Sequence, residues 1–318
     1  MKAAVFFMLV MGCLGCERSW HDRFAWKAED YFKDPETIQL CMSIQNNDLR
    51  AIEAAIESGA DVNVVGTEGM TPLLWAFPDN KIERFQLLIN AGADASILTK
   101  SDFKTNGRIK KGTTVAHLAA ASLFPNQFLA IVRKGIDANL EAACFPKEGN
   151  LFYAIMYARP WNNNTIERVE ALLLLKPDQS TLNQAVKVAL ACNEFEITLL
   201  LLESGAEFNS PFGLWGSPVH RVVAGEQAKG SFSHSELKAH NRLVEWLEAK
   251  GADLESARND FKRWSSQMGF DFEKSAAIRM NELRERAVKE NGETDFELPG
   301  VLDVMRRNIS VPNEGPVR

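Results

Sequence analysis

Apolar residues recur every three or four positions along the chain, in short runs separated by polar turns that contain glycine. Leu49, Ile52 and Ile56 show this spacing, and Gly59 follows them. Such a stripe predicts an amphipathic helix, and the glycine suits a left-handed position just beyond the helix end. Asp34-Pro35 predicts the start of a preceding helix, with aspartate as N-cap and proline in the first turn. The pattern therefore predicts a helix–turn–helix unit.

The same arrangement recurs down the chain. Residues 59–63 read Gly-Ala-Asp-Val-Asn, and residues 71–76 read Thr-Pro-Leu-Leu-Trp-Ala. This wording resembles the ankyrin repeat, whose usual sequence is T-P-L-H-x-A with a G-A-D-x-N turn, and Gly59 and Gly92 lie one ankyrin period of 33 residues apart. The resemblance implies an all-α ankyrin-repeat solenoid of about six helix–turn–helix units over residues 34–255. It also implies binding of another protein as the style of function.

The later units depart from the period. The third runs 43 residues from Gly92 to Gly135, and its surplus at residues 99–111 predicts an extended hairpin, called the finger below. In the fourth, Lys176-Pro177-Asp178 stands where Gly-Ala-Asp is expected, and its inner turn at 160–164 is long. The sixth is expected to contain a polar insertion at 225–240.

The carboxyl-terminal part is expected to close the array. Phe261, Trp264 and Met268 indicate a partial final unit, because an open solenoid end would expose its core. We expect a C-terminal helical cap at 256–292, including a charged helix, and a proline-containing flexible tail at 293–318.

The amino end has one positive charge, a short apolar run and small residues, which is typical of a secretory signal. Gly-Cys-Leu-Gly-Cys at 12–16 resembles a bacterial lipoprotein signal, in which a small residue precedes a lipidated cysteine. The resemblance implies a signal peptide at 1–15, lipidation at Cys16, a tether at 16–33 that packs partly on the first repeat, and a location in the periplasm. Cys13 is the alternative lipidation site.

Composition narrows the function classes. The 318 residues are 46% hydrophobic with a net charge of −6, which argues for a folded core and against broad binding to nucleic acid. The remaining cysteines, Cys41, Cys144 and Cys192, imply no disulfide framework.

The histidines and sequence motifs give no sign of catalysis. His117 and His220 occupy the ankyrin histidine position and are expected to bond backbone of the neighbouring turn. His234 and His240 lack metal-ligand spacing, and no catalytic or phosphate-binding motif is present. We expect no enzyme activity, no metal and no cofactor; an enzyme is the third hypothesis, because spatial constellations are invisible in a sequence.

The aromatic residues divide into core and surface candidates. Trp75, Phe85, Phe128 and Trp246 fall on helix stripes and are expected in the core. Other aromatic and basic residues fall on the finger, the long inner turn and the tip of the sixth unit, where ankyrin proteins bind partners. The partner-binding candidates are Phe103, Arg108, Lys110, Lys111, Trp161, Phe212, Leu214 and Trp215. Trp215 could instead fold back onto its own repeat, and the basic finger could be a solvated loop; otherwise its charge suits an acidic region of the partner.

Taken together, the array and the signal resemble periplasmic ankyrin lipoproteins of Gram-negative bacteria. Some of these are immunity proteins that block toxic effectors, including phospholipases delivered by type VI secretion. The resemblance implies a partner that is a toxic effector enzyme, and a membrane contact through the lipid anchor. The alternative is a periplasmic scaffold or envelope-stress partner protein.

Overall fold

The computed structural model describes residues 20–103, 109–142, 149–157, 164–211, 216–227 and 229–268. These residues form six successive helix pairs. The pairs are α4 (Pro35–Gln45) with α5 (Leu49–Glu57), α6 (Pro72–Ala76) with α7 (Ile82–Asn90), α8 (Val115–Ala121) with α9 (Pro125–Lys134), α10 (Leu151–Tyr157) with α11 (Thr165–Leu173), α12 (Gln179–Ala191) with α13 (Phe195–Glu203), and α14 (Pro218–Gln227) with α15 (His234–Ala249). Two short helices, α2 (Trp20–Phe24) and α3 (Ala28–Tyr31), precede the pairs, and α16 (Leu254–Met268) follows them. The 3-10 turn η1 (Thr67–Gly69) lies between α5 and α6, and η4 (Lys229–Ser231) lies between α14 and α15.

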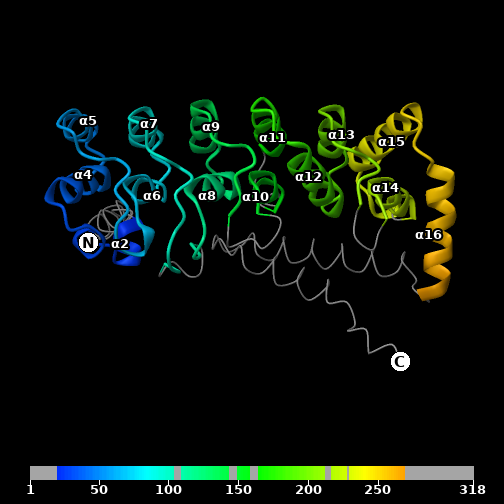
Figure 1. The fold of residues 1–318 in the computed structure, drawn as a ribbon, viewed down its shortest axis with the longest axis horizontal. Helices are drawn as coiled ribbons and strands as arrows, with labels where there is room; N and C mark the ends of the chain where they lie inside the picture. Colours follow the sequence, from blue (N-terminus) through cyan, green and yellow to red (C-terminus); the bar gives the residue numbers. More distant parts are fainter. Residues whose placement is uncertain are drawn as a thin grey trace, which may run out of the picture.

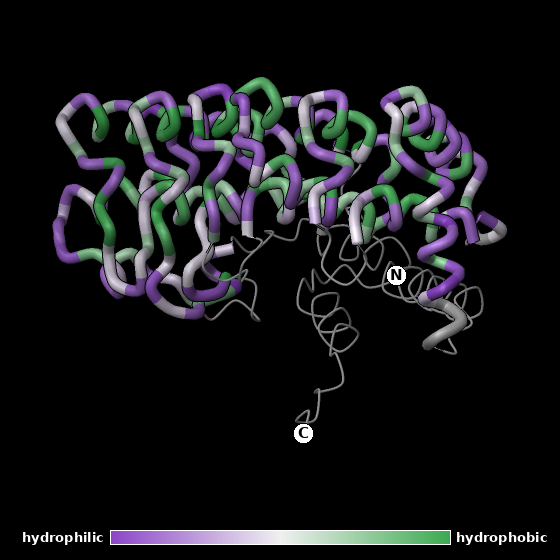
Figure 2. The backbone as a smooth tube through the Cα atoms, turned by 45° about the vertical axis from the view of Figure 1, so that its right-hand side comes forward, coloured by the Kyte–Doolittle hydropathy of each residue, from purple (hydrophilic) through white to green (hydrophobic). Residues whose placement is uncertain are grey.

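The pairs stack side by side into an elongated array (Figure 1). The first helices of the pairs lie in one row and the second helices in the row above it, and the connecting segments extend below (Figure 1). Along the tube in Figure 2, the strongly hydrophobic stretches lie mainly on the helices, and hydrophilic residues dominate many connecting segments. The core is therefore a continuous layer between neighbouring units, as expected of a solenoid.

Side-chain caps explain where the helices begin. Asp34, Thr71, Thr114 and Asp178 each accept a hydrogen bond from a backbone N–H three residues further on, at 2.7–3.2 Å. Each bond satisfies one of the amide groups that a helix start leaves without an intrahelical acceptor. The predicted N-cap at Asp34 is confirmed, and Thr71 caps α6 in the same way.

Left-handed residues explain where the second helices end. Gly59 and Gly92 have φ of 96° and 92°, a region that a Cβ disfavours. Lys176 occupies the equivalent position after α11 with φ 56°. The fourth unit therefore keeps the ankyrin turn although a lysine replaces its glycine.

Asparagine side chains tie one turn to the next. Asn63 donates from Nδ2 to the Gly92 carbonyl at 3.0 Å and accepts at Oδ1 from the Asp94 amide at 2.7 Å. Asn139 accepts from the Asp178 amide in the same way, at 2.9 Å. The last residue of the G-A-D-x-N turn thus joins neighbouring units. The fold is an ankyrin-repeat solenoid.

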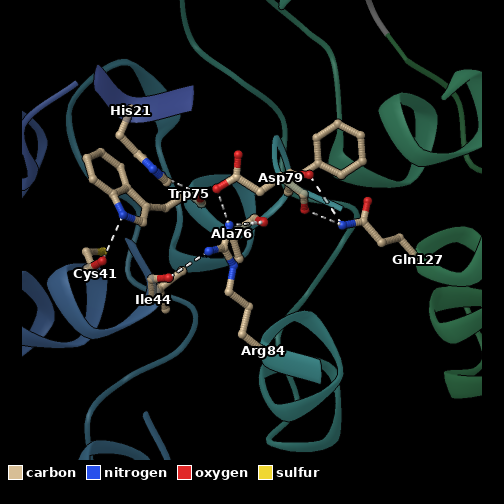
Figure 3. A network of polar contacts seen from close by, with 9 residues as sticks. His21, Cys41, Ile44, Trp75, Ala76, Asp79, Arg84 and Gln127 are labelled. Carbon is tan, nitrogen blue, oxygen red and sulfur yellow. Dashed lines mark hydrogen bonds and ion pairs between the residues drawn. The ribbon is translucent and has the colours of Figure 1, made fainter. Parts of the chain in front are cut away.

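Two buried side chains join the units at the ends of the first helices. Arg84 of α7 is 1% exposed and donates to the Ile44 carbonyl at 2.8 Å, the Ala76 carbonyl at 3.2 Å and the Asp79 carboxylate at 2.9 Å. Gln127 of α9 donates to the Asp79 carbonyl at 3.2 Å (Figure 3). These donors add hydrogen bonds to buried carbonyl groups at and just beyond the ends of α4 and α6, which lowers the cost of burying them.

Arg168 of α11 serves α8 in the same way. Its guanidinium donates to the carbonyl oxygens of Ala119, Ala120 and Ser122 at 2.9, 2.7 and 2.8 Å, and it lies 5.7 Å from the centre of the Phe128 ring. Burial lowers the pKa of Arg168 to about 10, so the guanidinium stays charged at neutral pH. Arg84 and Arg168 were not among the residues predicted to lie in the core.

The two ends of the array are covered by helices that do not belong to the repeat pairs. Leu254, Ala257 and Phe261 of α16 are buried, and this helix packs against α14, so it is the helical cap that the sequence predicts. The rest of the predicted cap, beyond residue 268, and the tail lie outside the described residues. At the other end, residues 20–33 form α2 and α3 and bury Trp26 and Phe32.

Burial confirms three of the four predicted core aromatics. Trp75, Phe85 and Phe128 are fully buried. Trp246 is only partly buried, so that prediction is wrong. The reason is its place near the end of α15, where the turn after α13 leaves one side of the ring open to a groove.

The prediction of a polar insertion at 225–240 is also wrong, because most of this segment is helical. Apart from residue 228, which is not described, the segment consists of the end of α14, a 3-10 turn and the start of α15. Ser233 and Glu236 form a capping box that opens α15. His240 is fully buried and its Nε2 lies 3.0 Å from the Val222 carbonyl. Polar residues of this segment thus include a helix cap at Ser233 and a core contact at His240.

Candidate protein interface

The finger is a hairpin, as the sequence predicts. Its arms pair through Thr99 N–H to the Thr113 carbonyl at 2.9 Å and Phe103 N–H to the Ile109 carbonyl at 3.0 Å. Lys100 N–H donates to the Glu68 carbonyl at 2.8 Å, which fastens the hairpin to the second unit. Residues 104–108, at its end, lie outside the described part of the chain.

Phe103 is not the exposed anchor that the sequence analysis expects. Its side chain is 3% exposed, and its ring centre lies 5.7 Å from that of Trp26 and 6.0 Å from that of Tyr31. The expectation of exposure is wrong because it treats residues 16–33 as a tether. The described part of that segment instead supplies an aromatic surface that covers the ring.

The covering segment is itself fixed to the array. The Trp26 ring packs 5.9 Å from Trp75, and His21 packs 4.4 Å from the same indole. His21 Nε2 lies 2.8 Å from the Trp75 carbonyl, and Trp75 Nε1 donates to the Cys41 carbonyl at 2.8 Å (Figure 3). We call Trp26, Tyr31, Trp75 and Phe103 the aromatic clamp. It connects the finger, the amino-terminal segment and the second unit.

The described lysines of the finger lie on the surface beside one carboxylate. Lys110 Nζ lies 3.1 Å from Asp102 Oδ2, and the Lys111 N–H donates to Asp102 Oδ1 at 2.8 Å. The backbone hydrogen bond from Lys111, and then the side-chain bond from Lys110, lower the pKa of Asp102. Within the described chain the Lys111 ammonium has no hydrogen bond or ion pair. The base of the finger therefore presents cationic groups from a fixed backbone.

Several predicted site residues fall outside the described chain, so their roles stay predictions. They are Cys16, Arg108, Trp161, Phe212, Leu214 and Trp215. The clamp residues Trp26 and Tyr31 were missed as functional candidates. Their signal was the aromatic density of residues 20–32, which exceeds what a solvated tether needs.

One serine–histidine–aspartate cluster resembles a catalytic arrangement. Ser217 Oγ lies 2.9 Å from His220 Nδ1, and His220 Nε2 lies 3.3 Å from Asp260 Oδ2 of α16. The same contact joins Thr114 Oγ1 to His117 Nδ1 at 2.7 Å, so it belongs to the repeat. The backbone N–H of Ser217 also donates to His220 Nδ1, at 3.2 Å. The cluster therefore fixes a turn and joins it to α16.

His117 shows the structural role of this histidine most clearly. Its Nε2 lies 2.5 Å from the Gly149 carbonyl, which confirms the predicted backbone contact. Burial lowers its pKa to about 4, against the raising effect of that hydrogen bond. His220 was expected to bond the backbone of the neighbouring turn. Its Nε2 instead contacts the Asp260 carboxylate of α16.

Two features of the described residues bear on other functions. No group of three or more His, Cys, Asp or Glu side chains in the described ranges could hold a metal ion. Among the helices described, none has the length and apolar character needed to cross a bilayer.

Comparison with known proteins yields structural likeness alone. No family model and no curated protein matches the chain. Among solved structures, the ankyrin repeat domain of Bcl-3, a member of the IkappaB family, is similar at 20% identity with a TM-score of 0.49, over 70% of this chain and 89% of that one. The likeness is too distant to carry an argument about partners, which must come from the surface of this chain.

Proposed function

We propose that this protein is a non-catalytic ankyrin lipoprotein of the bacterial periplasm, which binds and inhibits a secreted antibacterial effector such as a phospholipase. The observation that carries the proposal is the clamped finger. Phe103 is held between Trp26 and Tyr31, so Lys110 and Lys111 project from a fixed base. A preorganised surface loses less conformational entropy on binding than a free loop.

Charge supports a partner with an acidic surface. The chain carries a net charge of −6, yet the finger concentrates lysines around a single described carboxylate, Asp102. Local charge of the opposite sign to the partner speeds encounter and selects the docking orientation. An inhibitor needs no chemistry of its own, because occlusion of an active-site entrance is sufficient.

The periplasmic location and the lipid anchor rest on the amino-terminal signal. Gly15 precedes Cys16 after a short apolar run, as in lipoprotein signals. Replacement of Cys16 by alanine should release the protein from membranes. Unchanged fractionation would favour Cys13 or an unmodified chain.

Co-expression tests the immunity role. Where a secreted effector is encoded beside this gene, that effector should arrest growth when directed to the periplasm, and this protein should restore growth and co-purify with it. Charge reversal of Lys110 and Lys111 to glutamate should weaken the complex at least tenfold, about 1.4 kcal/mol. Reversal of Lys238 and Lys262, two exposed lysines on α15 and α16, is the matched control.

The result discriminates the alternatives. Absence of both rescue and complex would refute the immunity role. Co-purification with a resident periplasmic enzyme instead would support the scaffold alternative. Full affinity after charge reversal of Lys110 and Lys111 would show that the partner binds elsewhere on the array.

A further inference from the structure

An open groove lies between the fifth and sixth units, far along the array from the finger. The turn that follows α13 forms one side, and the carboxyl-terminal end of α15 forms the other; these two helices stand next to each other in Figure 1. Its volume is about 850 Å³, which is within the range of ligand-binding clefts. All residues that line it belong to the described chain.

Two aromatic rings form the apolar part of the groove. Phe208 and Trp246 meet edge to face, with ring centres 6.3 Å apart, and both are partly buried. Lys250 Nζ lies 5.5 Å from the centre of the Trp246 ring. The indole face therefore already attracts a cation within the protein, as expected from the negative potential above an aromatic ring.

Polar groups around the rings favour a cationic guest. Glu203 and Glu207 are exposed at the groove, and their two carboxylates outweigh the single Lys250 ammonium. Glu207 Oε2 accepts a bond from Asn183 Nδ2 at 3.1 Å.

We propose that this groove binds an arginine side chain of a partner protein. The flat guanidinium stacks on Trp246 in place of Lys250, and its N–H groups donate to the carboxylates of Glu203 and Glu207. Arginine fits better than lysine because its planar group combines stacking with several fixed donors. The inference rests on the protein-binding role proposed above, but it concerns a different surface from the finger and requires no particular partner.

Peptide titration of the full chain tests the site without the partner. The probes are acetyl-Gly-Arg-Gly-amide, its lysine analogue and its citrulline analogue, which keeps the shape of arginine but has no charge. The readout is the indole N–H resonance of Trp246, assigned with Trp246→Phe. The arginine peptide should shift this resonance at millimolar concentration, the lysine peptide less, and the citrulline peptide at least tenfold more weakly.

Variants distinguish a binding site from a passive surface. Glu203→Gln with Glu207→Gln should weaken arginine binding about tenfold, because two charge-assisted bonds become neutral ones. Lys250→Met should strengthen it several-fold by removing the internal competitor, whereas Lys238→Met, at an exposed position elsewhere on α15, should leave it unchanged. All four substitutions are at exposed positions, and unchanged thermal melting confirms the fold.

Three outcomes would overturn the proposal. They are no Trp246 shift with the arginine peptide, equal shifts with the citrulline peptide, or weaker binding after Lys250→Met. None of them depends on the finger or on growth rescue. A negative peptide titration therefore does not contradict the proposed function, and absence of growth rescue does not contradict arginine binding in the groove.

Discussion

Mild acid should weaken the array through His117. The ring is 1% exposed, and burial lowers its pKa from 6.5 to about 4 in the folded protein. The folded state therefore disfavours the proton that the unfolded chain accepts readily. The contribution of His117 to stability is fully present above its unfolded-state pKa of 6.5. It decreases as the pH falls below 6.5 and is lost once the pH is below the folded-state pKa of about 4.

The size of the loss follows from the two pKa values. The shift corresponds to ~3 kcal/mol once the pH is below the folded pKa, and to roughly 2 kcal/mol at about pH 5. Solvent does not screen the charge of the protonated ring, because the ring is enclosed and contacts Thr114 and the Gly149 carbonyl. Burial also lowers the pKa of His21 and His240, so both add to the acid sensitivity in the same direction.

Urea unfolding at about pH 7.5 and about pH 5, followed by circular dichroism, measures the effect. His117→Gln cannot take up the proton, so its loss of stability between the two pH values should be smaller than that of the wild type by roughly 2 kcal/mol. The contributions of His21 and His240 cancel in this difference. His234→Gln, on the exposed first turn of α15, is the control. An identical pH dependence in wild type and His117→Gln, or an imidazole resonance of His117 that titrates at the unfolded value, would refute the reasoning.

Three further changes test the scaffold. Lys176→Gly should raise stability by about 1 kcal/mol, because Lys176 has φ 56° and glycine tolerates this region; a lower melting temperature would contradict this. Arg168→Met should lower the free energy of unfolding by about 3 kcal/mol, since the buried carbonyls of Ala120 and Ser122 lose the guanidinium donor, whereas Arg133→Met at an exposed site of α9 should not. Phe103→Ala should free the finger from the aromatic clamp, so that protease cuts the finger first while the helices stay protected; unchanged cleavage would show that the clamp does not hold it.

The repeat architecture could be predicted because its signals are local. A cap acts within three residues, as at Thr71 and Leu74, and a left-handed turn involves one residue, as at Gly59. Even the degenerate fourth unit kept this local conformation at Lys176. Pattern reading therefore recovered the helix pairs and placed the finger between two of them.

The failures concern contacts between distant parts of the chain. Arg168 is bonded to carbonyls 46–49 residues away, and a carbonyl acceptor leaves no mark in the sequence because every residue has one. Burial of Phe103 depended on a segment more than 70 residues earlier, and exposure of Trp246 on the shape of a neighbouring turn. Periodicity shows which face of a helix is apolar, but it does not show what covers a loop.

The clamp also changes what a lipid anchor at Cys16 would do. With residues 20–33 packed on Trp75 and Phe103, only residues 17–19 remain between the anchor and the folded part. Four virtual bonds from Cys16 to Trp20 span at most about 14 Å. On the proposed lipidation, the first units and the base of the finger would therefore be held close to the bilayer surface rather than on a long tether. An effector that acts on membrane lipids would meet the finger where it reaches its substrate, so the clamp would fix the place of encounter as well as the shape of the binding surface.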